Sequence, residues 1–360
     1  MDDVNQAVNP KPTITDVARA AGVSKGLVSF ALNDRPGVSA RSRDHILRVA
    51  RELGYRPSVS ARSLSTSTSY ACGLVIARDP EIISADPFFP SFIAGVERVL
   101  VAEGRALVLS VVGGDEHEDA VYRTLAADKR VDGVFLTDLR RDDPRIPLLA
   151  ELGLPAVTLG RTPGSPFPAV ALDDTPGTAA ATQHLIEQGH RRIAHVIGPL
   201  RMMHAQRRHA AFAATMAAAG LDAGLVEETD FTAAHGAAAT ARLLDLANPP
   251  TAIVYDNDPM AIAGLGVAHE RGLRVPGDLS ITGFDDSEIA RYVYPALTSV
   301  RSDPQLWGEA AARSLLAAIA DRDPVADVDL PPAHLVVRAS TGPVSTGPSP
   351  SGPAPTGARA

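Results

Sequence analysis

The 360-residue chain carries 34 Lys and Arg against 42 Asp and Glu, with 45% hydrophobic residues and a mean hydropathy near zero. This composition is typical of a soluble globular protein, and no apolar run approaches the roughly 20 residues that a membrane-spanning helix needs. The single cysteine, Cys72, excludes an internal disulfide, and the acidic N-terminus lacks an apolar stretch. We therefore expect a cytoplasmic protein without a signal peptide.

Two short helices around a glycine are predicted near the N-terminus. Apolar residues at i, i+3, i+4 and i+7 indicate a helix from Ile14 to Ala21, with Thr13 as its N-cap and Gly22 as its end. Ser24 is suited to cap a second helix, whose inward positions are Leu27, Val28, Ala31 and Leu32. Two helices joined by such a tight turn are typical of a helix-turn-helix.

A third helix completes a small helical domain. It is expected to start at Ser39 and to stop at Gly54, and its buried face is Ile46, Val49, Ala50 and Leu53. In a helix-turn-helix the outward face of the second helix enters the DNA major groove. Here that face consists of Lys25, Gly26, Ser29, Phe30 and Asn33.

The charge distribution favours DNA binding over the alternative, a helical hairpin that only packs. Residues 1–66 carry 10 Lys and Arg against 6 Asp and Glu, whereas residues 67–360 carry 24 against 36. A basic head on an acidic body is typical of a nucleic-acid-binding module joined to a separate domain.

Three stretches together resemble the LacI family of bacterial transcription regulators. TITDVARAAGVSKGLVSFALN (13–33) is similar to the family's helix-turn-helix, VSARSRDHILRVARELGYRP (38–57) to its third helix, and SARSL (60–64) to its hinge helix. The resemblance implies a homodimer on a near-palindromic operator in double-stranded DNA, with Leu64 as a wedge in the minor groove. An isolated hinge helix of about eight residues is marginal in water, so we expect it to order only on DNA.

The resemblance also implies which residues contact DNA. They are Thr13, Ser24, Lys25, Gly26, Ser29, Phe30, Asn33, Ser39, Arg43, Tyr55, Ser58, Ala61 and Leu64. The sequence departs from the family at Phe30, where many members carry Arg, and at Leu27, where Thr is frequent. With fewer hydrogen-bonding side chains on this face, we expect Lys25, contacts of Phe30 with thymine methyl groups, and DNA shape to share the recognition.

Strand-like and helix-like segments alternate after the Ser/Thr-rich stretch at 63–69. Strands are expected at 72–77, 106–112, 131–136, 156–159, 169–172, 193–197, 252–254 and 279–282. Helices are expected at 90–103, 176–188, 207–219, 233–246, 259–271 and 305–320. This alternation predicts parallel sheets with helices on both faces. Together with the resemblance, it implies an all-α head and hinge helix followed by an α/β effector domain of two lobes, like a periplasmic sugar-binding protein.

The expected boundaries follow from these elements. The helix-turn-helix domain takes residues 1–57, the hinge helix and linker 58–69, the effector-binding and dimerisation domain 70–340, and a disordered Pro/Gly-rich tail 341–360. Within the effector domain, lobe 1 is expected at about 70–172 and 302–331, and lobe 2 at about 173–301 and 332–340.

The loops at the carboxyl ends of the strands are expected to form the effector site, as in other open α/β sheets. They hold carboxylates, arginines, an amide and aromatic rings, which are groups that bind a sugar-like ligand. The loops themselves offer Asp86, Phe88, Phe89, Arg161, Asn257 and Asp285, and Arg208 lies near the helix that follows the strand at 193–197. The resemblance favours Phe88, Phe89, Arg208, Asn257 and Asp285 as ligand contacts, whereas Gly160 stands where some members place a polar contact.

Each of these residues has a structural alternative. Asp258 and Asp285 could cap helices, Phe88 and Phe89 could belong to the core, and Arg207 and Arg208 could lie on a solvated face. His190 and His195 are poorly spaced for a metal, and Cys72 lies in an apolar strand pattern, so we predict no metal site, no cofactor and a buried thiol.

The sequence therefore predicts a DNA-binding transcription regulator, most often a repressor in this family, whose operator affinity is controlled by a sugar or related metabolite bound between the lobes. The alternative is an α/β enzyme or sugar-binding module acting on a small polar metabolite. The chain lacks GxxxxGK[ST] and HExxH, so we predict that it is not an enzyme. A transport-type binding protein would need a signal peptide and would not carry the head.

Overall fold

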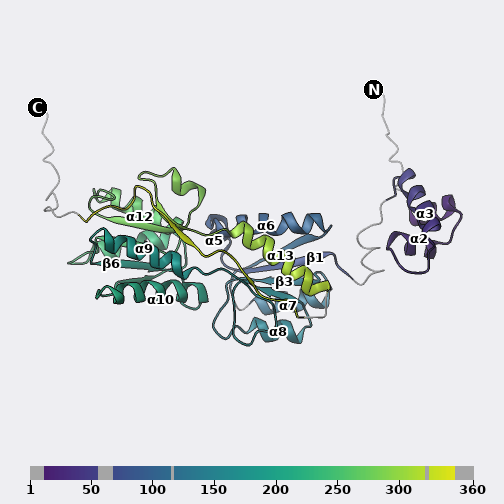
Figure 1. Cartoon of the computed structure of the whole chain (residues 1–360), viewed down its shortest axis with the longest axis horizontal. Helices are drawn as coiled ribbons and strands as arrows, with labels where there is room; N and C mark the ends of the chain where they lie inside the picture. Colours follow the sequence, from purple (N-terminus) through teal and green to yellow (C-terminus); the bar gives the residue numbers. More distant parts are fainter. Residues whose placement is uncertain (1–11, 56–67, 115–116, 321–323, 345–360) are drawn as a thin grey trace, which may run out of the picture. The chain divides into compact units, whose positions relative to one another are not determined.

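The computed structural model describes residues 12–55, 68–114, 117–320 and 324–344 (Figure 1). The chain divides at Tyr70 into an N-terminal head and an effector domain. The predicted hinge residues Ser58, Ala61 and Leu64, and the tail from residue 345, lie outside the described residues.

Three helices form the head: α1 (Ile14–Ala21), α2 (Lys25–Leu32) and α3 (Ala40–Glu52). The predicted caps are confirmed, because Thr13, Ser24 and Ser39 each accept a hydrogen bond from a backbone N–H of the first helical turn. Gly22 ends α1 in the left-handed region at φ 67°. A small apolar core joins the helices and includes Val17, Val28, Ala31, Ile46 and Val49.

Lobe 1 of the effector domain contains a four-stranded parallel sheet in the order β2-β1-β3-β4. Its strands are β1 (Ala71–Ala77), β2 (Ala106–Val112), β3 (Gly133–Leu136) and β4 (Ala156–Thr158). Helices α6 (Phe88–Ala102) and α13 (Pro304–Ala320) pack on one face, and α7 (Glu118–Ala127) and α8 (Arg145–Glu151) on the other. A short helix, α5 (Pro80–Ala85), precedes α6.

Lobe 2 contains a six-stranded sheet in the order β12-β10-β9-β8-β6-β7, in which only β12 is antiparallel to its neighbour. The strands are β6 (Ile193–Ile197), β7 (Val226–Glu228), β8 (Ala252–Tyr255), β9 (Ser280–Asp285), β10 (Thr298–Arg301) and β12 (His334–Val336). The helices are α9 (Thr175–Glu187), α10 (Met203–Ala218), α11 (Ala233–Leu244), α12 (Asp258–Glu270) and the 3₁₀ helix η2 (Glu288–Arg291). This arrangement confirms the predicted α/β architecture with two parallel sheets.

The chain passes between the lobes at three places, which lie between β4 and α9, between β10 and α13, and between α13 and β12. In the first and third of these connections, β5 (Val170–Ala171) pairs in parallel with β11 (Val328–Asp329). The boundary between the lobes is therefore built from segments far apart in the sequence.

Several elements escaped the sequence analysis. Strands β7, β10 and β12, each three or four residues long, and helices α7 and α8 were not predicted. The short strands β7 and β12 are edge strands with little apolar alternation, so they carry a weak signal. Residues 341–344, expected in the tail, are hydrogen-bonded to lobe 2: the ring of His184 contacts the Thr341 hydroxyl at 2.9 Å, and the Val344 N–H donates to the Gln188 carbonyl oxygen.

Helices α6 and α13 pack with glycine at their closest approach. An added Cβ at Gly308 would lie 2.1 Å from the carbonyl oxygen of Phe92, and one at Gly95 would lie 2.0 Å from that of Gln305. Backbone atoms cannot move aside as a flexible side chain can. The two glycines therefore set the distance between the helices that cover this face of lobe 1.

We predict that Gly308→Ala destabilises the effector domain by about 1–3 kcal/mol, because the two helices must separate to accommodate the methyl group. Gly266→Ala in α12 is the matched control, since an added Cβ there meets no atom within 4 Å. The control is expected to stabilise the domain by roughly 0.5–1 kcal/mol. Urea unfolding measures both changes, and equal stability of the two variants would contradict the packing argument.

Candidate functional site

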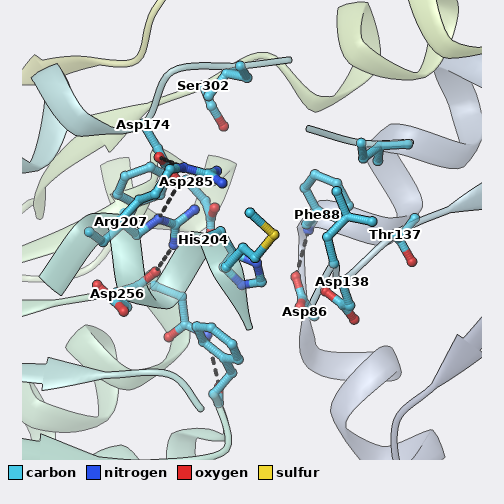
Figure 2. Close-up of a pocket in the computed structure, with 18 of the residues that line it drawn as sticks. Asp86, Phe88, Thr137, Asp138, Asp174, His204, Arg207, Asp256, Asp285 and Ser302 are labelled. Atoms are coloured by element: carbon cyan, nitrogen blue, oxygen red, sulfur yellow. Dashed lines mark hydrogen bonds and ion pairs between the residues drawn. The ribbon is translucent and has the colours of Figure 1, made fainter. Parts of the chain in front are cut away.

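A cavity of the effector domain is lined by side chains from both lobes, at the carboxyl ends of their parallel strands. Arg78 follows β1 and Asp138 follows shortly after β3 in lobe 1, whereas Asp256 follows β8 and Asp285 ends β9 in lobe 2. Figure 2 shows Asp86, Phe88 and Asp138 on one side, and Asp174, Arg207, His204 and Asp285 on the other. A ligand here would touch both lobes at once.

The lobe 1 wall is organised around Arg78. Its guanidinium donates two hydrogen bonds to Asp138, each 2.7 Å long, and a third of 3.0 Å to Asp86. Burial opposes the charge of Asp138, but Arg78 more than compensates and lowers the pKa of that carboxyl group to about 2. At Asp86 burial prevails over Arg78, and the pKa is raised. These three groups are fixed before any ligand arrives.

The lobe 2 wall holds two further arginines, both on α10. Arg207 and Arg208 donate to the carboxylate of Asp174, at 3.0 Å and 3.3 Å respectively. Arg208 also donates to the carbonyl oxygen of Asp256 at 2.7 Å, and its guanidinium carbon lies 3.5 Å from the centroid of the Phe284 ring. All three arginines that line the cavity are therefore paired with carboxylates.

Asp285 differs from its neighbour Asp286. The carboxylate of Asp286 is fully buried, accepts from Arg301 at 2.6 Å and pairs with Arg338. Asp285 lines the cavity, and its carboxylate has no hydrogen-bond or ion-pair partner among the described residues. Burial and the nearby carboxylates of Asp258 and Asp86 raise the pKa of Asp285 well above its usual value. Asp285 is the one of the pair that is available to a ligand.

Aromatic and neutral polar groups complete the cavity. Phe88 meets Trp307 edge to face with ring centroids 5.8 Å apart, and the ring of His204 stacks on Phe231 at 5.5 Å. Burial, with Arg208 as a further cause, lowers the pKa of His204 to about 4, so its ring is neutral near pH 7. The cavity thus combines apolar ring surfaces with groups that can donate or accept hydrogen bonds.

Most of the residues expected at the effector site meet in this cavity. Asp86, Phe88, Arg208, Asn257 and Asp285 all line it. The side chain of Asn257 is already engaged, because its oxygen caps α12 at the Met260 N–H and its amide donates to the Phe231 carbonyl oxygen. Asn257 therefore shapes the wall and has little hydrogen-bonding capacity left for a ligand.

Two of the expected residues do not line the cavity. Phe89 is 1% exposed and packs in the core between α6, α13 and the sheet. This is the core position that the sequence analysis gave as the alternative to a ligand contact. Arg161 is half-exposed and pairs with Asp327 at 3.0 Å and Asp329 at 2.6 Å, beside the β5–β11 pair. Arg161 was predicted because it follows a strand, but its side chain pairs with carboxylates beside β5 and β11.

Arg78, Asp138, Asp174 and His204 also line the cavity, and none of them was predicted from the sequence. Arg78 comes directly after a predicted strand and Asp138 two residues after another, so the rule that identified Asp285 could also have identified them. His204 lies one turn before Arg208 on α10, whose start was predicted four residues too late. Asp258, one of the possible caps, instead accepts from the Ser287 N–H at 2.7 Å and from the Ser299 hydroxyl at 2.6 Å.

The two histidines whose spacing argued against a metal site have hydrogen-bonding roles. His190 contacts the hydroxyls of Thr251 and Ser280, at 2.9 Å and 3.0 Å, and His195 contacts Asp256 at 3.0 Å. No group of three potential ligands lies close enough to hold a metal ion in the part of the chain that the structure describes. Cys72 is buried, and burial raises the pKa of its thiol to about 12.

In the head, the outward face of α2 is accessible. Lys25 and Gly26 are exposed, and Phe30 is 40% exposed with Arg35 beside its ring. Two other expected contacts are engaged within the head: Arg43 donates to the Arg35 carbonyl oxygen at 2.7 Å, and Tyr55 packs against the core. Asn33 donates to the Ser29 carbonyl oxygen at 2.9 Å.

Comparison with known families accounts for both parts of the chain. Residues 13–58 match the bacterial regulatory proteins of the lacI family, and residues 182–341 match the periplasmic binding protein-like domain. The HTH-type transcriptional regulator CelR of Thermobifida fusca is 38% identical over 338 residues, which cover 92% of this chain and 98% of CelR. The chain belongs to the LacI family of bacterial transcription regulators.

Other relatives of this LacI-family regulator agree. The HTH-type transcriptional regulator AglR of Rhizobium meliloti (strain 1021) is 35% identical, covering 92% of this chain and 94% of AglR. A structure of a CelR–cellobiose complex has a TM-score of 0.70 at 35% identity and covers 91% of this chain and 99% of its own. The lac repressor dimer bound to operator and the anti-inducer ONPF has a TM-score of 0.79 at 29% identity. The match covers 92% of this chain and 99% of the lac repressor chain.

This LacI-family regulator is thus a DNA-binding transcription regulator and not an enzyme, as the sequence predicted. Among its described residues, no helix is both long and apolar enough to cross a membrane.

The different environments of Asp285 and Asp286 predict opposite stability changes. Because the folded-state pKa of Asp285 is raised, ionising it costs stability as the pH rises above about 4, the unfolded value. Asp285→Asn should therefore raise the melting temperature at neutral pH and have no effect near pH 4. Asp286→Asn leaves Arg301 and Arg338 poorly paired and should cost about 1–3 kcal/mol. Melting temperatures at pH 4 and pH 7 test both, and destabilisation by Asp285→Asn at pH 7 would make that residue a structural carboxylate.

Proposed function

We propose that the effector of this regulator is an uncharged sugar, and that its binding between the lobes controls operator affinity. The cavity charges are the main support. Five Asp and three Arg line the cavity, and each Arg is paired with Asp. A phosphate or carboxylate on the effector would meet no unpaired arginine there and would lie near several carboxylates. Neutral hydroxyl groups avoid that cost.

The remaining groups suit a sugar. The unpaired carboxylate of Asp285 can accept hydrogen bonds from hydroxyls, and the neutral ring of His204 can donate one and accept one. Phe88 and Trp307 offer apolar surface to the C–H faces of a pyranose ring. The similarity to the CelR–cellobiose complex makes cellobiose the first sugar to test.

The only tryptophan of the chain, Trp307, lines the cavity and so provides a direct reporter. We predict that cellobiose or another neutral sugar changes the intrinsic tryptophan fluorescence saturably, whereas glucose 6-phosphate and glucuronate do not. The same sugar should change operator affinity by about 5- to 150-fold. Arg161→Ala is the control variant, because Arg161 lies outside the cavity, and it should retain the wild-type response. Tighter binding of a phosphorylated sugar than of any neutral one would refute the proposal.

For the head, we propose that the exposed face of α2 enters the major groove, with Lys25, Gly26, Ser29 and Phe30 at the contact. Thr13, Ser24 and Ser39, whose hydroxyls cap the three helices, are proposed to contact phosphates near the helix N-termini. Leu64 remains the proposed minor-groove wedge, together with hinge contacts at Ser58 and Ala61.

Lys25→Ala should discriminate between base reading and phosphate contact. If Lys25 reads a base edge, the substitution costs about 1–3 kcal/mol on an operator obtained by in vitro selection and little on random duplex. Loss of a phosphate contact alone would weaken both duplexes equally and reduce the salt slope by about one. We predict the first result. Fluorescence anisotropy at several salt concentrations measures both quantities, and Lys129→Ala in the effector domain is the charge-matched control.

We further propose that the regulator acts as a homodimer in the bacterial cytoplasm. Ile289, Tyr292 and Tyr294 are 56%, 74% and 99% exposed in and just after η2, which is unusual for large hydrophobic side chains. A second copy of the chain would cover them. The solved lac repressor, which is similar in fold, is a dimer on its operator.

A further inference from the structure

Main-chain atoms join the two lobes at one edge of the effector cavity. The N–H of Met203, the first residue of α10 in lobe 2, donates to the carbonyl oxygen of Leu139 in lobe 1 at 2.8 Å. Arg140 and Met202 form an isolated antiparallel bridge beside this bond. Next to it, the guanidinium of Arg141 in lobe 1 donates to the side-chain oxygen of Gln206 in lobe 2 at 3.0 Å. We call these two hydrogen bonds, together with the bridge between Arg140 and Met202, the interlobe latch.

The lobe 1 half of the latch is held by a buried arginine. Arg145 is 1% exposed and donates to Glu118 at 3.0 Å and to Asp143 at 2.7 Å. The same guanidinium donates to the carbonyl oxygens of Thr137 at 2.9 Å and Asp138 at 3.0 Å. Ionic groups this deeply buried are costly unless their geometry is maintained, so the segment 137–143 is tightly constrained.

The same segment carries part of the cavity wall. Asp138 is held with a backbone φ of 49°, and its carboxylate binds the guanidinium of Arg78. Arg78 in turn reaches lobe 2, where its guanidinium lies 5.2 Å from the centroid of the Phe231 ring and 3.9 Å from the sulfur of Met202. The segment 137–143 therefore carries both Asp138 of the cavity wall and Leu139 of the interlobe hydrogen bond.

We propose that the interlobe latch couples the effector cavity to lobe closure, by holding the cleft closed around the effector. The proposal rests on the proposed effector site in this cleft. An effector that contacts both lobes binds tightly only to the closed form, so its apparent Kd rises as the closed fraction falls. The latch thereby sets both the fraction of the protein in which the cleft is closed and the apparent affinity for the effector.

Met203→Pro removes the latch hydrogen bond while keeping the helix. Met203 is the first helical residue of α10, where proline is favoured, and Met202 has φ −89° and ψ 132°, which suit a residue before proline. Met203→Ala is the matched control, because it also removes the long side chain but keeps the N–H. Circular dichroism checks that both variants retain their helices.

Two readouts separate the latch from the sugar proposal. In the unliganded protein, hydrogen exchange at the cavity walls around Arg78 and Phe231 should be faster in Met203→Pro than in Met203→Ala. The Kd for cellobiose, followed through Trp307 fluorescence, should be about twofold to tenfold higher in Met203→Pro, the factor for one lost hydrogen bond. Arg141→Ala deletes only the exposed interlobe bond to Gln206, which is 3.0 Å long, and should shift exchange in the same direction by less.

Equal exchange in Met203→Pro and Met203→Ala would overturn the latch, and so would an equal Kd for cellobiose. If wild-type protein does not bind cellobiose, the choice of sugar is wrong, and the exchange comparison still decides the latch. If Met203→Pro does not fold, the exchange of Arg141→Ala against wild type decides it, and unchanged exchange overturns the proposal.

Discussion

The pairing of arginine with carboxylate in the cleft is the interaction on which the effector site depends. Arg78 binds Asp138 and Asp86 in lobe 1, and Arg207 and Arg208 bind Asp174 in lobe 2. These pairs place rigid polar groups on both walls without leaving an arginine free for an anion. Asp285 stands apart, since its carboxylate lacks such a partner in the described part of the chain and its pKa is raised. An unpaired acid in a lined cavity costs stability, and binding of a hydroxyl-rich ligand offsets that cost.

Lobe 1 is held rigidly by its own packing, whereas the main-chain contact between the two lobes is small. Lobe 1 is fixed by the close approach of α6 and α13 at Gly95 and Gly308, and by the buried Arg145 network. The main-chain contact at Leu139 and Met203 is slight by comparison. Two stiff bodies joined by a few bonds can move as units, so weak interactions at the cleft are able to bias a large change. That property is what a regulator needs to convert effector binding into altered DNA affinity.

The fold was largely predictable because its signals are local. Capping residues, glycine stops and apolar periodicity located the helices of the head, and alternating strands and helices indicated the parallel sheets. The rule that ligands bind at strand ends identified Asp86, Arg208 and Asp285, and applied fully it would have reached Arg78 and Asp138. It could not separate Asp285 from Asp286, because the partners of Asp286, Arg301 and Arg338, arrive from distant β10 and the segment after β12. Arg161 failed for the same reason, since its partners Asp327 and Asp329 lie far along the chain.

If a neutral sugar is recognised through the carboxyl group of Asp285, sugar binding must be linked to the protonation of that group. Hydroxyls that donate to this group favour its charged form, so sugar binding should release protons where Asp285 is partly protonated. Calorimetric titration of cellobiose in buffers of different ionisation enthalpy, from pH 5 to pH 8, measures that release. We predict that the wild-type protein releases protons on binding the sugar, and that any residual binding by Asp285→Asn releases none. Sugar binding with no proton release at any pH, or with the same release in both proteins, would contradict it.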